Sequence, residues 1–157
     1  MIQRIQTLYL LIVTALMAVT LFTPLAFIGV DGHQVTLSAF AITDAEGVLS
    51  HASAWLGALL AIATLLPLVT IFLYKNRTLQ IRLCGVECVL LVGVALLIGA
   101  FVYSISNNIF ADFDITWSNV VLRFPIIMPI ASVILTPIAM KAILRDELLV
   151  RSLDRIR

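Results

Sequence analysis

The stretch that decides the fold lies between residues 54 and 74 and reads AWLGALLAIATLLPLVTIFLY. It contains no charged residue, and none occurs anywhere between Glu46 and Lys75. A helix that crosses a bilayer core of about 30 Å needs roughly 20 mostly apolar residues. We therefore predict a membrane-spanning helix over residues 54–75.

Three more blocks of the chain have the same character. No charge lies between Arg4 and Asp31, from Cys88 to Ala111, or from Phe124 to Met140. The predicted fold class is therefore an all-α membrane protein, a single four-helix domain over residues 1–157, with helices at about 5–24, 54–75, 82–105 and 120–141. The first apolar run continues well past the length of a signal peptide, so we expect an uncleaved anchor.

The composition of the 157 residues excludes an ordinary soluble domain. Apolar residues make up 62% and charged residues only 12%, with a mean hydropathy of +1.12, whereas a soluble domain usually has about 25% charged residues. Ten Lys and Arg nearly balance nine Asp and Glu, so the chain has no general basic field and nucleic acid is not an expected partner.

Basic residues are distributed unevenly along the chain. Nine occur at the N-terminus, in the loop between the second and third predicted helices, and in the C-terminal tail: Arg4, Lys75, Arg77, Arg82, Lys141, Arg145, Arg151, Arg155 and Arg157. The tenth is Arg123, and the loops on its side of the membrane are acidic. Because Lys and Arg are in excess in cytoplasmic loops, both termini are predicted to be cytoplasmic.

The outward segment 25–53 has the pattern of a small antiparallel β-meander. Asp31-Gly32 is a two-residue hairpin signal, the flanking residues favour strands, and residues 44–47 (DAEG) form a second candidate turn. Two or three short strands are not stable alone, so the sheet is expected to lie on the helix ends or on a partner. The alternative is an irregular loop.

The tail, residues 142–157, has the pattern of an amphipathic helix. Leu149, Leu153 and Ile156 share one face, and basic residues on such a helix attract anionic lipid. One interpretation is a continuation of the fourth helix at the cytoplasmic surface. The other is a docking peptide for a cytoplasmic partner. In both, the residues expected to dock lipid or a partner are Arg145, Arg151, Arg155 and Arg157.

Glu87 is the acidic residue that lies inside a predicted span. Counted from Arg82, it lies about 7–8 Å below the interface at 1.5 Å per residue. A carboxylate at such a position is a functional candidate, and it could act as a coupling site for protons. The structural alternative, which we favour, is a pair with Arg4 at the cytoplasmic end of the first helix.

Other reactive side chains do not form a recognisable catalytic pattern. Cys84 and Cys88 lie on one face of the third helix and are predicted to be inert thiols facing a reducing compartment. His33 and His51 lie in the outward segment and are predicted to be solvated. The sequence has no Ser-His-Asp set, HExxH or Gly-rich phosphate loop, so we predict no catalytic, cofactor or metal site and no enzyme activity.

The outward base Arg123 lies at the start of the fourth predicted helix. It is expected to pair with Asp112 or Asp114, which precede it, or with Asp31 across the bundle. Pro125, Pro129 and Pro137 follow it, so a bend in this helix is expected.

The two ends of the chain resemble a known family. The opening residues 1–10 (MIQRIQTLYL) and the closing residues 145–157 (RDELLVRSLDRIR) are similar to those of small four-helix inner-membrane proteins from Bacteroidota, catalogued as a domain of unknown function. The resemblance covers the whole length in layout and is specific at the two ends. It implies a bacterial inner membrane and no established activity.

The general plan is also similar, by analogy of architecture alone, to that of claudin-type proteins, although the claudin outer motif is missing. We predict a non-enzymatic scaffold or accessory subunit of a larger membrane complex. The expected partners are the lipid bilayer and a membrane protein or further copies of the chain. The alternative is a small oligomeric proton-coupled transporter or channel that uses Glu87.

Overall fold

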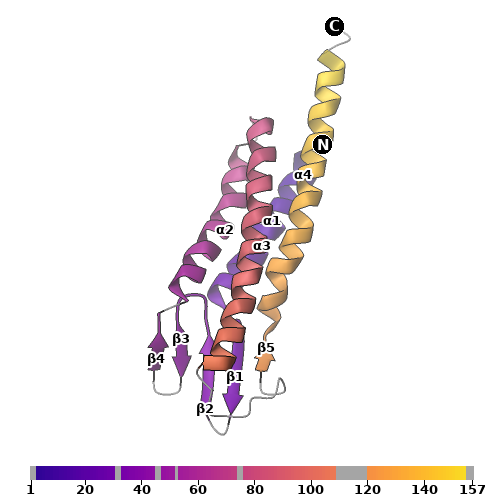
Figure 1. Ribbon diagram of the computed structural model, residues 1–157. Helices are drawn as coiled ribbons and strands as arrows, with labels where there is room; N and C mark the ends of the chain where they lie inside the picture. Colours follow the sequence, from indigo (N-terminus) through magenta and orange to yellow (C-terminus); the bar gives the residue numbers. More distant parts are fainter. Residues whose placement is uncertain are drawn as a thin grey trace.

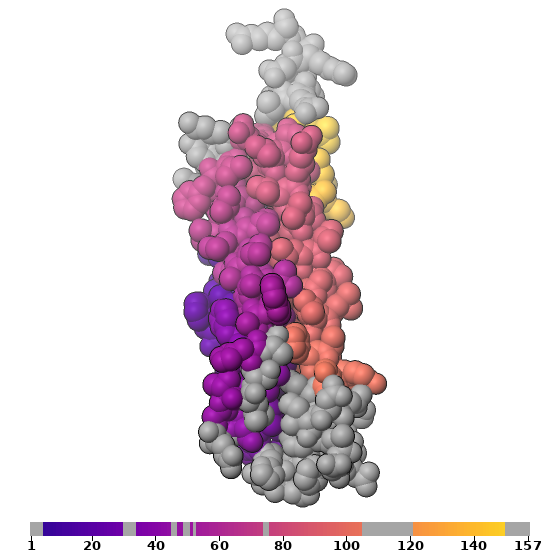
Figure 2. Space-filling view, turned by 60° about the vertical axis from the view of Figure 1, so that its left-hand side comes forward, coloured from indigo at the N-terminus to yellow at the C-terminus, as the bar shows by residue number. Residues whose placement is uncertain are grey.

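The computed structural model describes residues 3–30, 33–44, 47–51, 53–73, 76–108 and 120–154. They form an elongated bundle of four helices with a β-sheet at one end (Figure 1). The helices are α1 (Gln3–Phe22), α2 (Ala54–Phe72), α3 (Arg77–Asn108) and α4 (Ile127–Asp154). Each packs on its neighbours in sequence and α1 also packs on α4. Figure 2 shows α2 and α3 side by side along the molecule.

The outward faces of the helices are apolar, whereas several polar side chains point inward. Val89 of α3 is 75% exposed, and Leu11, Leu65 and Ile134 on the other helices are also exposed. The buried polar residues of the helices are Gln6, Thr20, Thr70, Gln80, Glu87, Ser132 and Thr136. This distribution is the reverse of that of a soluble bundle. It leaves four helices that are long and apolar enough to cross a membrane.

The sheet is antiparallel and has the strand order β4-β3-β2-β1-β5. Four strands come from the segment between α1 and α2: β1 (Ala26–Val30), β2 (His33–Leu37), β3 (Ile42–Asp44) and β4 (Gly47–Ser50). The fifth, β5 (Val120–Leu122), precedes α4. The prediction of a small antiparallel sheet is therefore confirmed, and the alternative of an irregular loop is wrong.

Both predicted turns join adjacent strands. Val30 pairs with His33 across the first turn, whose residues 31 and 32 lie outside the described part. Asp44 pairs with Gly47 across the second. Gly47 has a φ of 137°, a conformation that a residue without a Cβ adopts readily.

The start of the fourth helix differs from the sequence prediction. Residues 120–122 were expected to be helical, but they pair with β1 as Ala26↔Leu122 and Ile28↔Val120. The backbone N–H of Arg123 then donates to Leu25 O at 3.0 Å. A 3-10 turn, η2 (Phe124–Ile126), follows, and α4 begins at Ile127. The free edge of β1 competes for this segment, and its apolar, β-branched residues suit a strand as well as a helix.

Two helices extend beyond their predicted spans. α4 continues past residue 141 through most of the tail to Asp154, so the interpretation of the tail as a helical continuation of the fourth helix is confirmed. α3 spans residues 77–108 where 82–105 was expected. The C-terminal part of α3 continues beside the sheet (Figure 1). There Ile98 and Val102 join Ile28, Val35 and Leu37 in one buried cluster.

Gly57, in the first turns of α2, lies directly under the turn between β2 and β3. A Cβ at this position would meet the ring of Phe40 and would lie 2.8 Å from the carbonyl oxygen of Ala39. Sheet and helix therefore approach each other more closely here than a side chain allows.

The Gly57→Ala variant is expected to be less stable by about 1–3 kcal/mol, because the added methyl overpacks this contact. Gly93→Ala is the matched control, since no atom lies within 4 Å of a Cβ added at Gly93 of α3. Thermal unfolding in detergent, followed by tryptophan fluorescence, would measure both. Equal stability of the two variants would contradict the close approach.

Candidate functional site

The candidate site lies on the inward face of α3, where two polar side chains are buried. Gln80 donates a hydrogen bond from Nε2 to the carbonyl oxygen of Thr70 on α2 at 2.9 Å. Glu87 is 1% exposed. Neither of its carboxylate oxygens has a hydrogen-bond partner within the described part of the chain. A buried group of this kind is costly unless something compensates it.

Two interhelical contacts place Glu87 along the bundle axis. Neighbouring helices are antiparallel. The position seven residues after Gln80 on α3 therefore lies at the same height as the position seven residues before Thr70 on α2. This brings Glu87 level with Ala63. In the same way, the contact between Arg77 and Asp146 brings Glu87 level with Thr136 of α4.

Both levels are close to the middle of the helices that could span a membrane. Ala63 is the central residue of the candidate span Ala54–Phe72, and Thr136 lies at the middle of the span Phe124–Leu149. Glu87 itself is ten residues from Arg77, or about 15 Å at 1.5 Å per residue. Along the bundle Glu87 therefore lies further from the start of α3 than a count from Arg82 suggests, because α3 begins five residues before Arg82.

The predicted partner of Glu87, Arg4, lies in the first turn of α1, and its side chain is outside those described. Cys84 is buried beside Leu10, Ala139 and Ile143, whereas Cys88 is half-buried. Among the described residues, no three His, Cys, Asp or Glu side chains gather where they could hold a metal ion. His51 is exposed.

Arg123 has a partner that the sequence analysis missed. Its guanidinium carbon lies 4.4 Å from the centroid of the Phe27 ring, a cation–π geometry. Phe27 and Val121 are register partners in β1 and β5, and this pairing brings the next residues of the chain, including Arg123, beside Phe27. The predicted partners Asp31, Asp112 and Asp114 lie outside the described residues.

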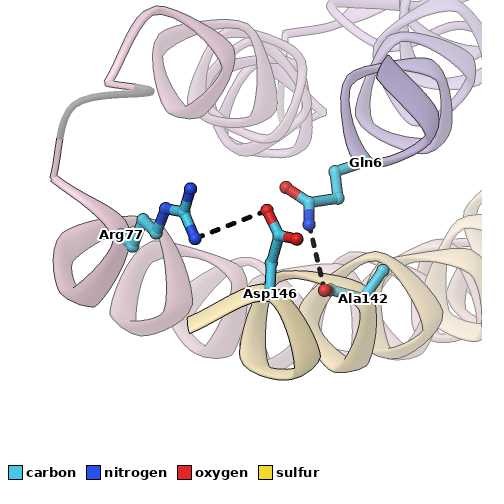
Figure 3. Close-up of polar contacts among 4 residues, drawn as sticks. All are labelled: Gln6, Arg77, Ala142 and Asp146. Atoms are coloured by element: carbon cyan, nitrogen blue, oxygen red, sulfur yellow. Dashed lines mark hydrogen bonds and ion pairs between the residues drawn. The ribbon is translucent and has the colours of Figure 1, made fainter. Parts of the chain in front are cut away.

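Polar contacts join the helices at the end opposite the sheet (Figure 3). Gln6 of α1 donates from Nε2 to Ala142 O of α4 at 3.0 Å. Nη1 of Arg77 lies 3.4 Å from Oδ2 of Asp146, an ion pair without hydrogen-bond geometry. The sequence signal for this pair is opposite charge on Arg77, at the start of α3, and on Asp146 of α4, at the end of the bundle where the topology brings these two helices together.

A groove between α1 and α4 lies at the same end. Its apolar lining includes Ile5, Tyr9 and Leu148, and Lys141 and Arg145 also line it. Arg145 is exposed there. Of the other predicted docking residues, Arg151 lies on α4 with its side chain outside those described, and Arg155 and Arg157 lie outside the described residues.

The fold and these contacts define a class: a bundle of four helices, long and apolar enough to cross a membrane, that carries a five-stranded antiparallel sheet at one end. A family model, described as Domain of unknown function (DUF4293), matches residues 2–156. The chain therefore belongs to the DUF4293 family. The search of curated proteins gives no match.

The two polar residues of α3 are expected to respond differently to substitution. Gln80→Met removes the hydrogen bond to Thr70 and should lower the free energy of unfolding by about 1 kcal/mol. Glu87→Gln keeps the shape of the side chain and removes no described hydrogen bond, so stability should be unchanged or higher. Unfolding in mixed micelles would compare them. A larger loss for Glu87→Gln would indicate that the carboxylate has a strong partner.

Proposed function

We propose that the chain is a multi-pass protein of a bacterial inner membrane, in Bacteroidota, with both termini cytoplasmic. The distribution of charge supports this orientation. Arg77, Arg82, Lys141 and Arg145 lie on α3 and α4 toward the end opposite the sheet, whereas Arg123 is at the sheet end. Basic residues mark the cytoplasmic side of a membrane protein.

Exposed aromatic residues support the same placement. Phe22 and Trp55 are 81% and 80% exposed and lie where α1 and α2 meet the sheet, and Phe124 is exposed at the start of η2. Phe72 is exposed at the other end of α2. Trp55 and Phe72 are 17 residues apart on α2, which is about 26 Å of helix and close to the thickness of a bilayer core. Trp side chains are enriched at membrane interfaces, which supports this level for Trp55.

Within that membrane, the proposed role is that of a non-enzymatic scaffold or accessory subunit of a larger complex. The observation that carries this proposal is the sheet, which lies beyond the proposed outer interface and exposes apolar side chains near both edges. Val48 on the edge strand β4 is 54% exposed, and Val121 and Leu122 on the opposite edge strand β5 are also exposed. Exposed apolar surface and an open strand edge are typical of protein-binding sites.

The proposed occupant of the β4 edge is an extended segment of another protein of the same complex. Pairing of such a segment with β4 would supply backbone hydrogen bonds, and Val48 would add apolar contact. At the opposite end, the groove with Lys141 and Arg145 suits an anionic lipid, because its apolar lining can take an acyl chain while the two cations meet the headgroup.

Purification of the tagged full chain from native membranes in mild detergent is expected to recover stoichiometric companion proteins. Val48→Lys should reduce their recovery several-fold, because a charge on the edge strand opposes strand addition. Gln34→Lys is the matched control, since it adds the same charge at an exposed position on the central strand β2. Recovery of a solitary monomer from the unchanged chain would refute the scaffold role.

A second candidate function is a small oligomeric proton-coupled transporter or channel. The observation that favours it is the mid-bundle height of Glu87, where a group that exchanges protons between two sides would lie. In proteoliposomes, proton-coupled flux would be expected from the unchanged chain and abolished by Glu87→Gln. Equal flux in both would exclude Glu87 as the coupling group.

A further inference from the structure

We propose that Glu87 and the broken backbone of α2 form a proton-binding site at the centre of the bundle, where Glu87 is held as a neutral carboxylic acid that donates its O–H to the carbonyl oxygen of Ala63. The inference rests on the membrane placement proposed above. It is independent of whether the chain transports anything.

The acceptor arises from the position of a proline. Pro67 lies inside α2 and is buried. Because proline has no backbone N–H, the carbonyl four residues earlier, that of Ala63, lacks its usual helical donor. In apolar surroundings such a carbonyl requires another donor. The Gln80–Thr70 hydrogen bond places Ala63 level with Glu87.

Burial allows the two groups to approach each other. Ala63 is fully buried on the inward face of α2, and its side chain is only a methyl group. Glu87 is buried on the inward face of α3, which packs against α2. A carboxylic acid has one O–H donor, whereas a carboxylate has none. Only the neutral form of Glu87 can therefore satisfy the carbonyl of Ala63.

α4 adds polarity near the same level. The hydroxyl of Thr136 donates to the carbonyl of Ser132 at 2.8 Å. The hydroxyl of Ser132, one turn further toward the sheet, is buried and has no hydrogen-bond partner within the described part of the chain. This hydroxyl lies nearer to the sheet than Glu87 does. It therefore extends the polar site toward the sheet end of the bundle.

Among the described side chains, no cation lies at the level of Glu87 to compensate a negative charge on its carboxylate. The titratable side chains toward this level are Tyr9 on α1, Cys84 and Cys88 on α3, and Lys141 on α4. The span of α2 between Ala54 and Phe72 holds no ionisable residue. Lys141 is exposed and lies five residues beyond the level of Glu87 toward the end opposite the sheet. A bound proton neutralises the carboxylate without a basic partner.

Labelling with the apolar reagent dicyclohexylcarbodiimide tests the site in carbonate-washed native membranes. The acid transfers its proton to a nitrogen of the carbodiimide while the carboxylate oxygen bonds to the central carbon, and the adduct rearranges to a stable N-acylurea. Peptide mass spectrometry at pH 7 should find Glu87 labelled more than tenfold above Asp146 and Glu147, which lie at the end opposite the sheet. The label should fall as the pH is raised, and it should be absent from Glu87→Gln.

Two proline variants test the acceptor. Pro67→Ala restores the backbone N–H that bonds the carbonyl of Ala63, so labelling of Glu87 at pH 7 should fall several-fold. Pro137→Ala, in α4, is the matched control and should leave the labelling unchanged. Equal labelling of the unchanged chain and Pro67→Ala would overturn the assignment of the Ala63 carbonyl.

Other outcomes would overturn the proton site itself. Labelling of Glu87 no higher than that of Asp146 would show that it is not held neutral. Protection of Glu87 by sodium ions at constant pH would show that the ligand is a metal cation. Both results require a chain that stays in the carbonate-washed membranes. A chain released by carbonate would instead contradict the membrane placement.

Discussion

Hydrogen bonds from buried glutamines to backbone carbonyls fix how the helices lie against one another. Gln6 ties α1 to α4 and Gln80 ties α3 to α2. An amide buried among apolar side chains must find a partner, and each of these glutamines finds a backbone carbonyl on a neighbouring helix. The register that they set places every other inward-facing residue, including Glu87.

The opposite end of the bundle is held by a different kind of contact. β5 and Arg123 join the start of α4 to β1 through backbone hydrogen bonds, and the sheet packs its buried face against the outer part of α3. The bundle is thus fixed by side-chain amides at one end and by a sheet at the other. Between these two ends, the helices are joined mainly by apolar packing. The middle of the bundle therefore offers a buried charge the fewest polar partners.

The sequence predicted the four helices and the antiparallel sheet because both depend on local patterns: long uncharged runs and turn residues between alternating apolar ones. It did not predict β5 or the contact of Arg123 with Phe27, because these depend on a pairing between segments more than 90 residues apart. Residues 120–122 are compatible with helix or strand by composition, and the free edge of β1 decides between them.

The level of Glu87 along the bundle was not predictable from the sequence for a related reason. A count from Arg82, the predicted start of the third helix, puts Glu87 only five residues into that helix. In the structure α3 starts at Arg77 and its outer end runs on beside the sheet, so the part of α3 level with the other three helices is centred near Glu87. A carboxyl group level with the middle of α2, at the height of the carbonyl that Pro67 deprives of its helical donor, has the surroundings expected for the proposed neutral acid.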